Sequence, residues 1–95
     1  MTEIHVRAVM TALLNTGFVK IEAAHHTMFW LVAGGRRRAI RTRLSHGQRK
    51  VDDWLLSEMA KQVRLSKQEL LSLIDCEMTG EEYLRLMIDR GYFGS

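Results

Sequence analysis

The sequence predicts an α+β fold, in which a small three-stranded antiparallel sheet has its helices on one face. The first observation is a change of apolar spacing along the chain. Apolar residues recur at helical intervals in residues 4–16, alternate with polar residues between 18 and 44, and return to helical intervals after residue 52. The second observation is that the 95 residues contain no proline and no low-complexity tract. We therefore expect one αβββα domain over residues 1–95, with a helical extension over 75–95 packed on or beside it.

The apolar positions predict the first helix and the first strand. Four apolar residues of the segment 4–16 share one helical face: Val6, Val9, Met10 and Leu13. Gly17 follows this segment and is the residue best suited to a left-handed helix C-cap. The segment 18–22 then alternates, with Val19 and Ile21 on one side and charged residues on the other, which predicts a half-buried strand.

Two further strands are expected on either side of a glycine turn. Residues 26–32 are rich in aromatic and β-branched side chains, and residues 37–44 alternate. A two-residue turn at Gly34-Gly35 would pair Phe29 with Ile40 across the hairpin. It would leave His25 on a largely apolar face, and on the other face it would gather these residues: Arg37, Arg41, Arg43, His26, Met28 and Trp30. A three-residue loop that includes the preceding alanine would shift this register by one residue, and such a slip exchanges the two faces of a sheet.

We favour the three-residue loop, because it collects five apolar side chains on one buried side of the sheet. These are Met28, Trp30, Val32, Ile40 and Leu44, and His26 is expected beside them. The opposite, open face is then expected to hold three cross-strand pairs: His25 with Arg43, Thr27 with Arg41, and Phe29 with Ala39. Arginines bind phosphates and an aromatic ring stacks on a base, so this face suits single-stranded RNA.

The C-terminal part of the chain predicts three helices from their N-terminal capping residues. Asp52 or Asp53 can cap the first of them. The next two begin with capping boxes, which are Ser66 with Glu69 and Thr79 with Glu82. Gly91 is suited to end the last helix.

The charges are segregated along the chain. The net charge is +3, yet residues 34–50 carry seven positive and no negative side chains, whereas residues 52–95 carry nine acids and five bases. A basic segment of this kind indicates a polyanionic partner that is bound at one place. The alternative interpretation is a solvated arginine face that prevents strands from pairing edge to edge.

Composition excludes several classes of protein. A single cysteine, Cys76, excludes a disulfide framework and a cysteine-based zinc site. Adjacent strand residues point to opposite faces, so we do not expect His25, His26 and His46 to form a metal site. The longest uncharged apolar run, residues 27–35, is too short to cross a membrane. We therefore expect a cytoplasmic protein with no cofactor, no metal and no membrane partner.

Several features, taken in order, resemble the HicA family of bacterial toxins. They are a helix ending in Gly17-Phe18, the pair His25-His26 that opens a strand, a hairpin, and His46-Gly47 with basic residues before a helix. The similarity continues through residues 55–62 and 65–70, so it covers residues 6–71. HicA proteins are small ribonucleases with a fold like that of double-stranded-RNA-binding domains. The resemblance implies this fold, a toxin that acts as an mRNA interferase, and a HicB-like antitoxin as its partner.

The resemblance also implies that His25 is the catalytic residue of a metal-independent endoribonuclease acting on single-stranded RNA. An imidazole titrates near neutral pH and suits the proton transfers of RNA cleavage. His46 is a candidate for a second acid/base group. We assign RNA binding to four cations and one ring: Arg37, Arg41, Arg43, Lys50 and Phe29.

Two alternative functions stay open. The family's Gly-Ser-His motif is replaced by Ala23-Ala24-His25, which favours a non-catalytic module of the same fold that binds RNA or a partner protein. Residues 60–70 have the spacing of a helix-turn-helix, which predicts binding to duplex DNA. However, Arg64 stands where that turn usually has glycine, and the surrounding segment is negatively charged, which disfavours contact with DNA.

Overall fold

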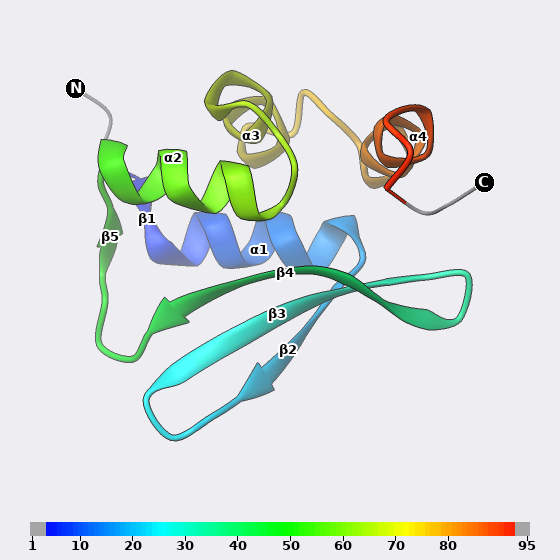
Figure 1. Ribbon diagram of the computed structural model, residues 1–95. Coiled ribbons are helices and arrows are strands. Elements are labelled where there is room, and N and C mark those ends of the chain that lie inside the picture. The colour runs from blue at the N-terminus through cyan, green and yellow to red at the C-terminus, as the bar shows by residue number, and fades with distance from the viewer. Residues whose placement is uncertain (1–3, 93–95) are drawn as a thin grey trace.

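The computed structural model describes residues 4–92, and these form an α+β fold (Figure 1). Three antiparallel strands make the main sheet, in the order β2 (Phe18–Glu22), β3 (His26–Ala33) and β4 (Arg36–Ser45). Two short strands, β1 (Ile4–His5) and β5 (Lys50–Val51), make a second sheet. The helices, in chain order, are α1 (Val6–Thr16), α2 (Asp53–Gln62), α3 (Lys67–Ile74) and α4 (Gly80–Asp89). These helices lie on one side of the main sheet, as predicted, and no described element covers its other face (Figure 1).

Helix α1 begins later than predicted, because residues 4–5 form β1, which pairs with β5. The His5 side chain caps the helix, since its Nδ1 accepts a hydrogen bond from the backbone N–H of Arg7 at 3.1 Å. At the other end, Gly17 adopts a φ of 116° and its N–H bonds to the Leu13 carbonyl. The predicted left-handed C-cap is therefore confirmed.

The hairpin of β3 and β4 follows neither predicted register along its whole length. At its tip, Gly34 and Gly35 have φ values of 64° and 74° and form a two-residue turn. This turn requires positive φ at both positions, which two glycines adopt easily, so the favoured three-residue loop is wrong. Beyond the tip, Leu31 of β3 lies opposite residues 38–40 of β4, and the register shifts by two.

A shift of two residues keeps the alternation of β4 unbroken and decides which side chains are buried. Six buried side chains of the hairpin face the helices: Thr27, Phe29, Leu31, Ile40, Thr42 and Leu44. Met28, Trp30 and His26 lie on the opposite, open face and are partly exposed. The prediction that these three side chains and Val32 are buried is therefore wrong, and so is the prediction that Thr27 and Phe29 lie on the open face.

The later helices begin at their predicted capping residues. Asp52 caps α2, since its Oδ1 accepts a hydrogen bond from the backbone N–H of Leu55 at 2.8 Å. Ser66 and Thr79 cap α3 and α4, each in a reciprocal capping box with the glutamate three residues later. Between α2 and α3, Arg64 adopts a φ of 66°, the left-handed conformation that glycine adopts more easily.

Helix α4 joins the predicted C-terminal extension to the core, while residues 93–95 of that extension lie outside the described residues. Tyr83 is fully buried, and its hydroxyl donates a hydrogen bond to the Val63 carbonyl at 2.8 Å. Its ring also lies 5.9 Å from the ring of Phe18, between centroids. Gly80 allows a close approach, because a Cβ there would lie 3.2 Å from the backbone at the end of α1.

Candidate nucleic-acid interface

The open face of the main sheet combines apolar side chains with arginines. Its apolar side chains come from β2 and β3, and they are Val19, Ile21, Met28, Trp30 and Val32. Val19 and Ile21 are each 40% exposed. On the same face, β4 contributes Arg37, Arg41 and Arg43. An apolar surface that stays uncovered and is bordered by polar groups indicates a binding site.

Trp30 lies on the middle strand of this face, against two guanidinium groups. Arg41 is its cross-strand partner, and the guanidinium carbon of Arg41 lies 4.9 Å from the ring centroid. Arg37 pairs with Val32, the next residue of β3 on this face, and its guanidinium carbon lies 4.5 Å from the same centroid. A guanidinium that contacts a ring through its flat face keeps N–H donors at its edge for other partners.

The backbones of two histidines are joined at the end of the sheet remote from the glycine turn. His25 is exposed between β2 and β3, and its carbonyl accepts a hydrogen bond from the His46 backbone N–H at 3.2 Å. The His46 Nε2 lies 3.2 Å from Oε1 of Glu22. The same carboxylate oxygen accepts a hydrogen bond from the Thr27 hydroxyl at 2.8 Å. We call the group of His25, His46 and Glu22 the histidine end.

The surroundings of Glu22 keep its carboxylate ionised. The hydrogen bond from Thr27 is the largest effect that lowers the pKa of Glu22, and the contacts with His46 and Lys20 act in the same direction. An ionised carboxylate accepts hydrogen bonds only, so the Glu22 Oε1 can accept one from the His46 Nε2. Glu22 pairs with Thr27, which faces the helices, so this contact lies on the helical side of the sheet end.

Three of the predicted RNA-binding residues share the open face, and two do not. The three are Arg37, Arg41 and Arg43. Arg43 pairs with Met28, so its predicted pairing with His25 is wrong. Phe29 is fully buried in the core, where its ring cannot stack on a base. Lys50 lies in β5, in the second sheet, and is therefore not part of the open face.

The open face and the histidine end also contain two residues that the sequence analysis did not select. Trp30 was assigned to the core, because a large ring on an alternating strand usually faces inward. The alternative two-residue turn at Gly34-Gly35 places Trp30 on the same face of the sheet as the arginines of β4. For Glu22 no sequence pattern indicates the contact with His46, because it joins the last residue of β2 to the turn after β4, far apart in the chain.

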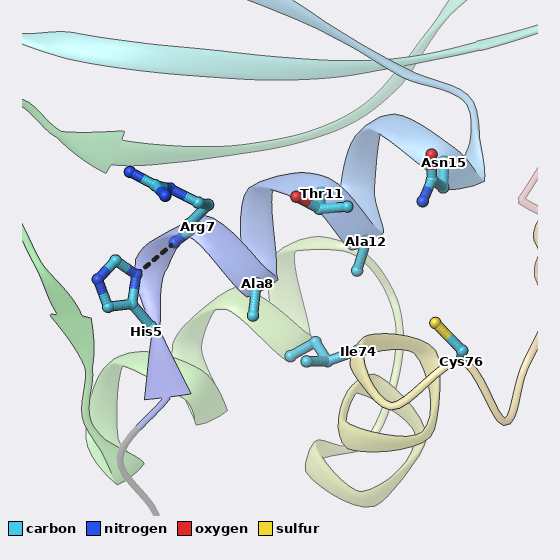
Figure 2. A pocket seen from close by; sticks show the side chains of 8 residues that line it. All are labelled: His5, Arg7, Ala8, Thr11, Ala12, Asn15, Ile74 and Cys76. Carbon is cyan, nitrogen blue, oxygen red and sulfur yellow. Dashed lines mark hydrogen bonds between the residues drawn. The ribbon is translucent and has the colours of Figure 1, made fainter.

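A separate hollow of about 480 Å³ lies on the helical side of the molecule (Figure 2). Its lining residues are His5, Arg7, Ala8, Thr11, Ala12, Asn15, Ile74 and Cys76. His5 directly precedes α1, and the lining residues from Arg7 to Asn15 lie on α1. Ile74 is the last residue of α3, and Cys76 follows it (Figure 2). This hollow therefore has no residue in common with the open face or the histidine end.

Among residues 4–92, no group of three His, Cys, Asp or Glu side chains is placed to hold a metal ion. None of the helices in this part of the chain is long and apolar enough to cross a membrane. Comparison of the chain with protein-family models, with curated proteins and with solved structures finds no match. The resemblance to the HicA family therefore stays a prediction.

Proposed function

We propose that this chain binds single-stranded RNA on the open face of its sheet and cleaves it at the histidine end. The observation that carries the proposal is Trp30, which stands on an uncovered face with the guanidinium groups of Arg37 and Arg41 against its ring. A base stacks on an aromatic ring or on a guanidinium plane that lies over one, and phosphates contact the N–H groups of the arginines. Arg43 continues the row of cations along β4 toward the histidine end.

Single-stranded RNA fits this surface better than a duplex does. The bases of a duplex stack on one another, so their flat sides are not accessible to a ring on a sheet. Unstacked bases, in contrast, would contact the apolar side chains of β2 and β3. The seven positive charges of residues 34–50 add a sequence-independent attraction for phosphates.

The histidine end supplies the two proton-transfer groups for RNA cleavage. In this reaction a base removes the proton of a 2′-hydroxyl, the 2′-oxygen bonds to the adjacent phosphorus, and the bond to the 5′-oxygen breaks. An acid protonates the departing 5′-oxygen, and a 2′,3′-cyclic phosphate remains. We assign one transfer to His25, as the resemblance implies, and the other to His46, which contacts Glu22. Arg43 would stabilise the negative charge on the phosphate.

The resemblance also leads us to expect a HicB-like antitoxin as protein partner. To block the reaction, it would have to cover the open face and the histidine end. Acidic side chains of the antitoxin would complement the arginines of β4, and its apolar side chains would pack on Val19 and Ile21.

Cleavage of an unstructured RNA by the wild type, His25→Ala and His46→Ala, in excess chelator, tests this proposal. Each alanine variant should cleave about 10²–10⁴-fold more slowly, because it lacks one acid/base group. Gel-shift binding should change little, since the phosphate contacts come from arginines. His5→Asn is the matched control, because it removes an imidazole from the cap of α1 and leaves a good capping side chain.

Different outcomes separate the proposed function from its alternatives. Equal cleavage by the wild type and both alanine variants would remove the imidazoles from the mechanism. RNA binding without cleavage by the wild type would favour the non-catalytic module. A preference for duplex DNA over single strands would favour the helix-turn-helix interpretation.

A further inference from the structure

A groove runs along the boundary between β4 and α2, where the open face meets the helical side. It consists of three hollows of about 660, 410 and 240 Å³ that have lining residues in common. All three are lined by Gln62, the first two also by Arg41, and the last two by Arg43. The Thr42 hydroxyl donates a hydrogen bond to the Gln62 Oε1 at 2.6 Å, which fixes this amide in the middle of the groove. We call it the β4–α2 groove.

Cations border the β4–α2 groove along its length. Two come from the sheet and two from α2 and the residues after it, and they are Arg41, Arg43, Lys61 and Arg64. Among the lining residues the one carboxylate is that of Glu58, which lies 3.3 Å from the Nζ of Lys61. The groove is therefore positively charged overall, as a channel for a phosphate backbone must be.

A tryptophan stands at each end of the groove. Trp30 lines the first hollow, and Trp54 lines the last. Trp54 lies on the first turn of α2 and is 72% exposed, so its ring contributes little to the core. An exposed ring beside a cationic channel is a stacking platform for a base.

We propose that the bound RNA strand follows the β4–α2 groove and that one base stacks on Trp54. This inference rests on the proposed function, to which it adds the path of the strand and a second stacking site. A path across β2 is the competing possibility. There the open face offers Val19 and Ile21, and neither side chain binds a phosphate.

The β4–α2 groove leads toward the histidine end. The hollow at Trp54 is also lined by His26 and Ser45, which pair with each other and are the chain neighbours of His25 and His46. A strand that leaves the groove at Trp54 would therefore reach the end of the sheet where His25 and His46 lie. Trp54 is accordingly a positioning residue, whose loss weakens substrate binding more than the chemical step.

The test measures the affinity of wild type and variants for a fluorescent, unstructured oligoribonucleotide of about 12 nucleotides by anisotropy. Trp54→Ala should weaken binding about tenfold, and Trp54→Phe should restore most of the loss, because a phenyl ring still stacks. Lys61→Glu should weaken binding as well. Arg7→Glu is its matched control, because it reverses one exposed cation on α1, outside the groove (Figure 2).

The outcomes of this test separate the proposed path of the strand from the proposed function. Tight binding by the wild type, with losses in Trp54→Ala and Lys61→Glu but not in Arg7→Glu, supports the path. If Trp30→Ala weakens binding while Trp54→Ala and Lys61→Glu behave like Arg7→Glu, the path is wrong and the proposed function stands. A loss in Ile21→Ser in place of Trp54→Ala would direct the strand across β2. Absence of RNA binding by the wild type would overturn both the path and the proposed function.

Discussion

The open face of the sheet and the layer formed by α3 and α4 use arginines in different ways. In the helical layer, the Arg90 guanidinium donates hydrogen bonds to the Glu69 carboxylate and to the Arg64 carbonyl, so it joins α4 to α3 and to the turn before it. On the open face, the guanidinium groups of Arg37 and Arg41 contact a tryptophan ring. The first arrangement connects parts of the fold, whereas the second presents donors to solvent.

This difference teaches that the number of charges in a segment does not reveal their role. The acidic C-terminal part has capping boxes and cross-helix ion pairs, which are structural uses of charge. The basic segment borders a partly exposed ring and a groove, and this arrangement favours binding of a ligand. Variants in the helical layer should therefore change stability, and variants on the open face should change RNA binding.

The largest expected effect is on stability and concerns Tyr83. Tyr83→Ala should lower the free energy of unfolding by about 3–5 kcal/mol, because it removes a fully buried ring. Tyr83→Phe should cost about 1–2 kcal/mol, since it leaves the Val63 carbonyl without its hydroxyl donor. Urea denaturation followed by circular dichroism measures both values. The RNA affinity of the folded variants should equal that of the wild type. A loss of affinity would contradict the assignment of the helical layer to stability alone.

The second largest expected effect is on RNA binding and concerns Trp30. Trp30→Ala should weaken RNA binding by about 1–3 kcal/mol, because it removes the ring that we propose a base stacks on. The free energy of unfolding should change by about 1 kcal/mol or less, since the side chain is partly exposed on an uncovered face. Anisotropy and urea denaturation on one preparation give both numbers. A large loss of stability with unchanged RNA affinity would show that Trp30 stabilises the fold and does not bind RNA.

The smallest expected effect is the pH dependence that comes from Glu69. The hydrogen bond from Arg90, followed by that from the Ser66 backbone, holds the pKa of Glu69 below its ordinary value of 4.5. The carboxylate therefore stabilises the folded state above about pH 4.5, and this contribution is lost as the pH falls through the lower, folded-state pKa. Glu69→Gln should lower stability at neutral pH by about 0.5 kcal/mol and reduce its decline in acid.

Urea denaturation of the wild type and Glu69→Gln at neutral and acidic pH measures this difference. Glutamine preserves the capping box, so the comparison isolates the charge. In an Arg90→Gln background the effect of Glu69→Gln should shrink, because the two side chains interact directly. An effect of the same size in both backgrounds would show that the ion pair contributes nothing.

The parts of the fold that were predicted correctly depend on neighbours in the sequence. Gly17 ends α1 because a left-handed residue is needed there, and the position of glycine reveals that requirement. The capping boxes at Ser66 and Thr79 join residues only three positions apart, so their spacing is visible in the chain. The pairing of β1 with β5, in contrast, joins distant segments of two residues each, and no periodicity marks it.

The register of the hairpin could not be predicted, because it depends on where β4 carries extra residues. Both registers that the sequence suggests assume a regular ladder from the turn to the strand ends. The structure instead places Leu31 opposite three residues of β4, and the alternation of β4 runs through this point unbroken, so no spacing in the sequence marks it. Arg37, Arg41 and Arg43 therefore share the open face as predicted, whereas Phe29, the ring that was predicted beside them, is buried and Trp30 lies there instead.

The irregular pairing in β4 also limits how the length of this hairpin can change. Its two surplus residues are an even number, so the strand beyond them keeps Arg41 and Arg43 outside and Thr42 inside. Deletion of two residues from positions 38–40 would regularise the ladder and preserve both faces. Deletion of one would leave two residues of β4 opposite Leu31, which is the count of an ordinary β-bulge. A regular ladder with both faces kept therefore requires the loss of two residues at this point.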